Sequence, residues 1–129
     1  MDRPYQVTAK DVDRVVRREY PPARHETVWS ILKAYPDDNP MFGADRVRAC
    51  ALRLAKGNEA HLRHAIETAL IDPRDVIAPA ENPDWGRHAA RESALRGRGR
   101  PLTELEPVGI VLARDRAQFQ AWLRHGDAG

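Results

Sequence analysis

The chain has 129 residues, of which 42% are hydrophobic and 31% are charged, with a formal net charge of +2. This length and balance fit one folded domain with a single core and exclude a disordered chain. No stretch approaches the roughly 20 apolar residues that a membrane-spanning helix requires, so we expect no membrane partner.

The cysteine content bears on the cellular setting. Cys50 is the single cysteine, so no internal disulfide can form. No signal-peptide pattern occurs near Met1. We therefore expect the reducing cytoplasm of a bacterium. Cys50 also shares a helical face with apolar neighbours, which favours buried packing over a role as a nucleophile.

Two helices are predicted before residue 36. Thr8 and Asp11 resemble a capping box at the start of the first helix, and Pro21 ends it. Pro36 ends the second helix. Each helix has apolar residues at the spacing of one helical face: Val12, Val15, Val16 and Tyr20 in the first, and Val28, Ile31, Leu32 and Tyr35 in the second.

The segment from Tyr35 to Gly43 is predicted to be an exposed loop. Its Asp, Asn, Pro and Gly residues each favour non-helical backbone. A calcium site formed by Asp37, Asp38 and Asp45 is disfavoured, because proline interrupts the regular spacing that the oxygen ligands need.

A helical hairpin and a further short helix are predicted next. Asp45 begins the third helix, and Gly57 with Asn58 ends it and caps the fourth. After Asp72 and Pro73 one or two more helical turns are expected. The inward positions are Val47, Cys50, Ala51 and Leu54 in the third helix, Leu62, Ala65, Ile66, Ala69 and Leu70 in the fourth, and Val76 and Ile77 in the last turns.

Residues 45–85, which contain these helices, resemble a segment that recurs in a family of small bacterial helical proteins with an R-D-V turn. The resemblance covers about a third of the chain. It implies a helical fold, and it carries over no activity and no site residue.

The C-terminal part is less regular. Residues 86–101 hold five basic side chains and one acidic side chain. A helix over residues 87–96 is compatible with the sequence, but the glycines at 97 and 99 favour a flexible segment. Residues 108–112 form either a strand, paired with Tyr5 to Val7, or a helix that starts at Pro107. From Asp115 a last helix is predicted, with its apolar face formed by Phe119, Trp122 and Leu123.

Together these elements predict a mainly α protein, an irregular bundle of four to six short helices, with one short C-terminal strand near the N-terminus as an option. The expected organisation is a helical core domain over residues 1–85, a basic flexible segment over residues 86–101, and a strand or turn plus a helix over residues 102–129.

No catalytic or cofactor-binding set stands out. His61 and His64 are three residues apart and are weak candidates for a metal site, but a solvated helix face explains them more simply and no third ligand is evident. The serines lack a nucleophile elbow, and the glycines lack a phosphate-binding loop. We therefore expect no cofactor and favour a non-enzymatic protein over an enzyme, with a small histidine-based enzyme or metal-binding protein as the second alternative.

The best functional lead is a protein-binding surface. We predict that it combines the arginine segment with the loop, through Arg87, Arg91, Arg96, Arg98, Arg100, Asp37, Asp38, Met41 and Phe42. Arginine forks suit carboxylates on an acidic protein partner, and they suit phosphate equally well. Nucleic-acid binding through the same arginines is therefore the alternative. The simplest interpretation of the arginine segment is a solvated tether whose charges contribute only to solubility. The oligomeric state stays open.

Overall fold

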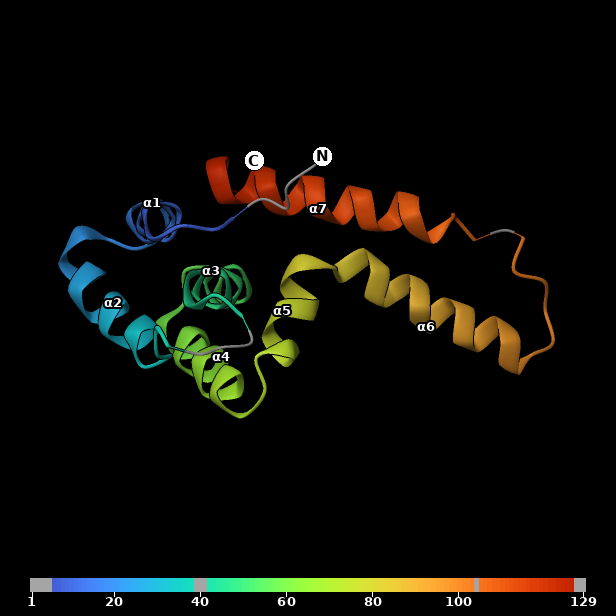
Figure 1. Ribbon diagram of the computed structural model, residues 1–129, viewed down its shortest axis with the longest axis horizontal. Coiled ribbons are helices and arrows are strands. Elements are labelled where there is room, and N and C mark those ends of the chain that lie inside the picture. Colours follow the sequence, from blue (N-terminus) through green and yellow to red (C-terminus); the bar gives the residue numbers. More distant parts are fainter. Residues whose placement is uncertain (1–5, 39–41, 104, 127–129) are drawn as a thin grey trace.

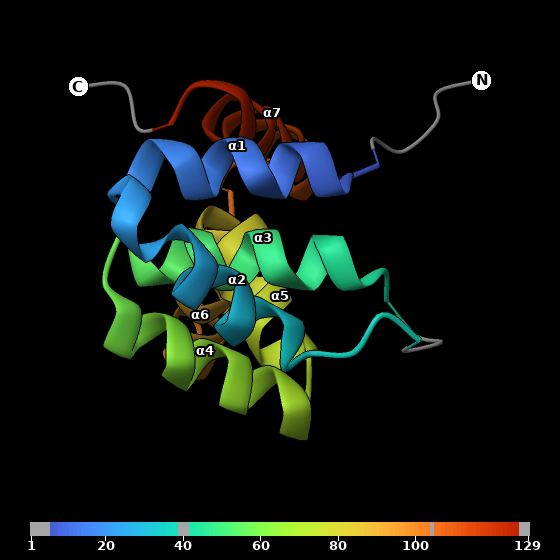
Figure 2. The same cartoon turned by 90° about the vertical axis from the view of Figure 1, so that its left-hand side faces the viewer.

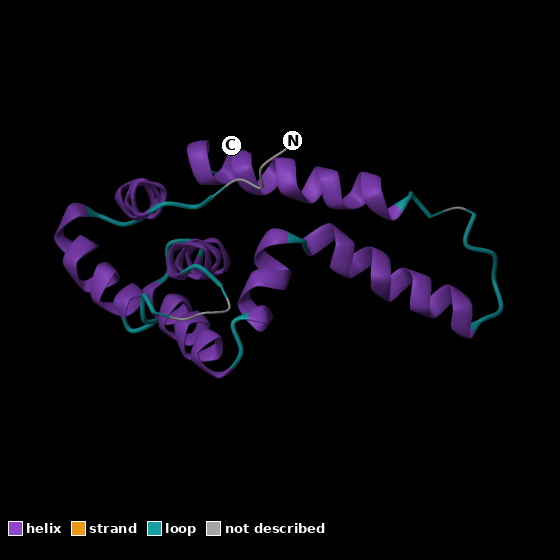
Figure 3. Cartoon of the chain, in the orientation of Figure 1, coloured by secondary structure: helices purple, strands orange, loops and turns teal. Residues whose placement is uncertain are grey.

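The computed structural model describes residues 6–38, 42–103 and 105–126. Within these ranges the chain forms seven α-helices and one short 3-10 helix, and it forms no strand (Figure 3). The mainly α class predicted from the sequence is confirmed, with one helix more than the predicted upper number. No helix in the described part is long and apolar enough to cross a bilayer.

The first helix, α1 (Ala9–Glu19), begins at the predicted capping box. The Thr8 hydroxyl accepts the Asp11 N–H, and the Asp11 carboxylate accepts the Thr8 N–H at 2.9 Å. The 3-10 helix η1 (Pro22–Arg24) then leads directly into α2 (His25–Lys33). Pro21 and Pro22, at the start of η1, therefore separate α1 from α2.

The centre of the core is α3 (Ala44–Ala55), which packs against α1, α4 (Glu59–Ile71) and α5 (Arg74–Glu81). In Figure 2, α3 lies between α1 and α4. Eight of its twelve residues are buried, Cys50 among them. Four of the eight are alanines, and such small side chains let neighbouring helices approach closely.

A buried arginine ties the end of α2 to α3. Arg48 donates hydrogen bonds to the Leu32 carbonyl at 3.0 Å and to the Tyr35 carbonyl at 2.6 Å. It also donates to the Asp37 carboxylate at 2.7 Å. The Leu32 carbonyl also accepts the Tyr35 N–H at 3.2 Å, so Arg48 is its second donor. The bonds of Arg48 therefore fix where the following loop begins.

The last two helices, α6 (Pro83–Gly97) and α7 (Val108–His125), form a hairpin whose tip extends away from the other helices (Figure 1). The sequence led us to expect a flexible segment over residues 86–101, but residues 83–97 are helical. Alanine, leucine and arginine favour this helix. The glycines end the helix rather than prevent it, and Gly99 has a φ of +64°.

The helical alternative for residues 108–112 is the one observed, because α7 starts directly after Pro107 and includes them. The optional strand is therefore absent there, and Tyr5 lies outside the described residues. At the other end of α7, Phe119, Trp122 and Leu123 are buried against the core. The guanidinium groups of Arg18 and Arg53 stack on the Trp122 ring. The core thus includes residues of α7 in addition to those before residue 85.

Candidate interaction surface

The base of the hairpin is held by a buried carboxylate. Asp115 of α7 is fully buried and accepts the backbone N–H groups of Asp84 at 3.1 Å and Trp85 at 2.8 Å. Its negative charge also lies at the positive end of the α6 dipole. No side chain next to α6 in the sequence caps the helix. Asp115 therefore supplies the cap of α6 from another helix.

Sequence reasoning did not identify this role of Asp115. The available signal is its position four residues after Val111 and four before Phe119, inside an apolar face. An acidic residue at such a position is expected to be buried and to need hydrogen-bond donors.

Beyond its base the hairpin is only partly packed. None of the fifteen residues of α6 is buried. On α7 the apolar face that is buried at Phe119 and Trp122 continues toward Val108 and Leu112, which are 49% and 40% exposed. Trp85 at the start of α6 is also 40% exposed. We call Trp85, Val108 and Leu112 the apolar edge of the hairpin.

A small pocket lies between the two helices of the hairpin. It has a volume of about 240 Å³ and is lined by Asp84, Arg87, His88, Arg91, Leu105, Glu106, Val111 and Arg114. Arg87 pairs with Asp84, and Arg114 pairs with Glu106. We call this cavity the hairpin pocket. Arg91 contributes to it without an ion-pair partner among the described residues.

The other predicted arginines lie nearer the tip of the hairpin, outside the hairpin pocket. Arg96 is exposed and pairs with Glu92 at 3.0 Å. Arg98 and Arg100, just after α6, are exposed. The tip is therefore basic and solvated, and the hairpin pocket gathers only two of the five predicted arginines, Arg87 and Arg91.

The loop that we predicted to join the arginines lies elsewhere. Asp37 and Asp38 are exposed, and Asp37 is bound to Arg48. Phe42 is half-buried beneath the Arg46 guanidinium, and Met41 lies outside the described residues. The loop precedes α3, whereas α6 runs away from α3 toward the tip of the hairpin (Figures 1 and 2). The structure therefore does not unite the two halves of the predicted surface.

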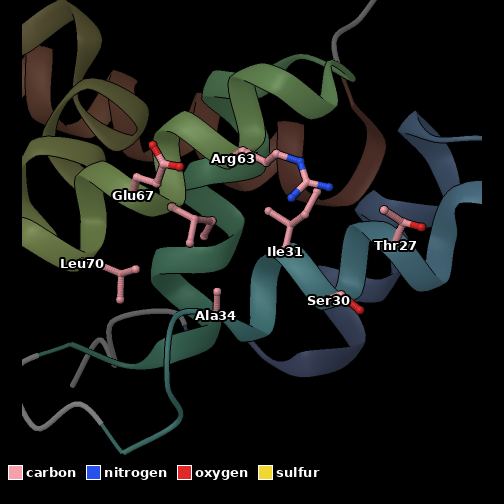
Figure 4. A pocket seen from close by; sticks show the side chains of 8 residues that line it. Thr27, Ser30, Ile31, Ala34, Arg63, Glu67 and Leu70 are labelled. Carbon is pink, nitrogen blue, oxygen red and sulfur yellow. The ribbon is translucent and has the colours of Figure 1, made fainter.

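A second hollow, which the sequence did not suggest, lies between α2 and α4 (Figure 4). Its volume is about 300 Å³, and Ile31, Ala34 and Leu70 lie beside the polar Arg63 and Glu67. We placed Leu70 on the buried face of its helix, but it is 52% exposed at this hollow. The next residue, Ile71, is 88% exposed. Leu70 and Ile71 therefore form a second exposed apolar area at the end of α4, in addition to the apolar edge of the hairpin.

The two candidate histidines are exposed on α4. His61 and His64 line a cavity of about 380 Å³ together with Thr68 and Asp75. In the part of the chain that the structure describes, no three potential ligands are placed to hold a metal ion. The histidines therefore lie on one surface without forming a metal centre there.

Cys50 has the environment of a structural thiol. Its Sγ lies 3.7 Å from Glu81 Oε2, and Glu81 in turn accepts two hydrogen bonds from Arg46 at 2.7 Å. Burial, and after it the Glu81 charge, raises the pKa of the Cys50 thiol well above its usual value. The thiolate that nucleophilic chemistry needs is therefore disfavoured.

Comparisons with known proteins add no family to this description. No protein-family model matches the chain, and neither a similar curated protein nor a similar solved structure was found. The resemblance of residues 45–85 stays a prediction, and the case for function depends on the geometry of the hairpin.

Proposed function

We propose that this chain is a non-enzymatic protein-binding module whose contact surface is the α6–α7 hairpin. The proposal includes the reducing cytoplasm of a bacterium as its setting, which the single, buried Cys50 favours. The partner is a protein whose contact surface is apolar and acidic.

The observation that carries the proposal is the incomplete burial of the hairpin. An isolated helix of the length of α6 is marginal in water, and most helices gain their stability from packing an apolar face. None of the residues of α6 is buried, and the apolar edge beside it is open. A partner that covers Trp85, Val108 and Leu112 would supply the missing packing, at roughly 1.5–3 kcal/mol for each fully buried large side chain.

The composition of the hairpin favours a protein over nucleic acid. Trp, Tyr and Arg are enriched among binding hot spots, and the hairpin presents Trp85 near a run of arginines in the sequence. Single-stranded nucleic acid is bound by basic grooves lined with aromatic stacking rings. Val108 and Leu112 are aliphatic and would add nothing to such a site.

The test is site-specific photo-crosslinking in lysate of the source organism. A photoreactive amino acid replaces Leu112 in one sample and Ile71 in another, since Ile71 is an equally apolar exposed residue outside the hairpin. We expect a protein to crosslink at position 112 but not at position 71, and nuclease treatment to leave the product intact. Equal crosslinking at both positions, or a product that nuclease removes, would contradict the proposal.

A further inference from the structure

Among the described residues that line the hairpin pocket, there is one arginine more than there are carboxylates. Arg87 and Arg114 are each paired, with Asp84 and Glu106 respectively. Arg91 lines the same cavity and has no ion-pair partner among the described residues. A guanidinium offers a planar fork of donors that matches a carboxylate. Arg91 is therefore the group of this pocket that is available to an anion.

The walls of the hairpin pocket are held in place and are partly apolar. His88 Nε2 donates to the Glu106 carbonyl at 2.8 Å, which fixes the segment before α7 against α6. Leu105 and Val111 complete the lining. A volume of about 240 Å³ has room for a side chain, given that water occupies about 30 Å³ per molecule.

The charge of the hairpin pocket selects among anions. Among the described residues of its lining, three arginines face two carboxylates, so one bound negative charge would balance these side chains. A phosphate group with a charge near −2 would exceed that and would lie close to Asp84 and Glu106, which repel it. A single carboxylate fits the count.

We infer that the hairpin pocket binds one glutamate or aspartate side chain of an acidic, partly apolar peptide segment, with Arg91 as its main partner. This inference rests on the proposed function and names the chemistry of the partner. The apolar edge would contact the apolar residues of the same peptide segment. The carboxylate bound in the hairpin pocket would fix the position of that segment along the hairpin.

A double-mutant cycle tests this inference. The probes are a blocked helical peptide of leucine and glutamate, its counterpart with glutamine in place of glutamate, and inorganic phosphate. The proteins are the full chain and its R91Q, R98Q and L112E variants. R98Q is the matched control, because it removes the same charge from a residue outside the pocket. Binding is measured by titration calorimetry, and the Nε–Hε resonance of Arg91 is followed by NMR.

We expect the glutamate peptide to bind about tenfold more tightly than the glutamine peptide, as for one charge-assisted hydrogen bond. R91Q should remove most of this difference, R98Q should preserve it, and the glutamate peptide should shift the Arg91 resonance more than phosphate does. The carboxylate site is overturned if R98Q acts like R91Q, if phosphate shifts Arg91 more strongly, or if the glutamate peptide shows no preference or no binding.

The same data separate the carboxylate site from the proposed function. If L112E abolishes binding of both peptides while R91Q changes neither affinity, the hairpin binds protein but the pocket does not take a carboxylate. If L112E leaves the affinities unchanged, the apolar edge is not the contact surface and the proposed function itself fails.

Discussion

Replacing Asp115 with alanine is predicted to detach the start of α6 from α7. The change removes the acceptor of two backbone N–H groups at 3.1 and 2.8 Å. A hydrogen bond to a charged group contributes about 1.5–3 kcal/mol, and loss of a helix cap costs about 1 kcal/mol. The buried carboxylate no longer has to be desolvated in the variant, which offsets part of the loss. We expect Asp115→Ala to lower the free energy of unfolding by roughly 2–3 kcal/mol.

The asparagine variant makes this prediction sharper. Asn keeps the shape of Asp115, but its amide offers one acceptor oxygen and turns an NH₂ donor toward the second N–H. Asp115→Asn should therefore cost roughly 2 kcal/mol, nearly as much as alanine. Asp38→Ala is the control, because Asp38 is exposed and such changes fall within about 0.5 kcal/mol.

Urea unfolding measures the stability of these variants, and hydrogen exchange resolved by peptide shows where protection is lost. Because no residue of α6 is buried, exchange should accelerate first in α6 while α3 and α4 keep their protection. An Asp115→Asn variant as stable as the unmodified chain, or α6 amides whose exchange does not change, would refute the capping role.

Four further predictions concern other parts of the fold. Arg48→Met should lower the free energy of unfolding by roughly 3 kcal/mol, because the Tyr35 carbonyl loses the guanidinium as donor and the Leu32 carbonyl keeps only the Tyr35 N–H; a loss below about 1 kcal/mol in urea unfolding would contradict this. Gly86→Ala should raise stability by about 0.5–1 kcal/mol, since Gly86 lies inside α6 with open space around it. Gly57→Ala should lower stability by about 1–2 kcal/mol, because Gly57 has a φ of +79° and a Cβ would meet the Glu19 carbonyl at 3.2 Å. Thermal unfolding measures both glycine variants. A destabilised Gly86→Ala or a stabilised Gly57→Ala would refute the corresponding prediction. Burial raises the pKa of Tyr20 to about 12, so the folded chain keeps this proton while the unfolded chain releases it near 10. This contribution of Tyr20 to the free energy of unfolding is present below pH 10 and is lost between pH 10 and 12. The free energy of unfolding of Tyr20→Phe should therefore decline less steeply over this pH range than that of the unmodified chain. Equal declines would contradict the raised pKa of Tyr20.

The elements that the sequence predicts well are those with local signals. Thr8 with Asp11 and Asn58 act as caps within a few residues of themselves, and the structure confirms both caps. The apolar faces of the first four helices follow from spacing alone, because 3.6 residues per turn place such residues on one side. Leu70 is the exception, since its exposure depends on how far the neighbouring α2 extends.

The hairpin was harder to predict because its determinants are distant in the sequence. The cap of α6 comes from Asp115, which lies 31 residues from Asp84, so local rules find only arginines and glycines in this segment. The exposure of Val108 and Leu112 is equally hard to predict, because both lie at helical spacing from the buried Phe119 and Trp122 on α7. Only the path of α6 reveals that Val111 is covered, whereas Val108 and Leu112 are left open.

The contact surface is tested most directly by the affinity of the crosslinked partner, once it is purified, for the full chain and two charge-introducing variants. Leu112→Glu and Ile71→Glu place the same acidic group at exposed apolar positions, the first on the hairpin and the second at the end of α4. The proposed function predicts that Leu112→Glu weakens binding by at least about tenfold, a loss of about 1.4 kcal/mol, while Ile71→Glu leaves the affinity unchanged. Full affinity in Leu112→Glu, or an equal loss in both variants, would contradict the hairpin as the contact surface.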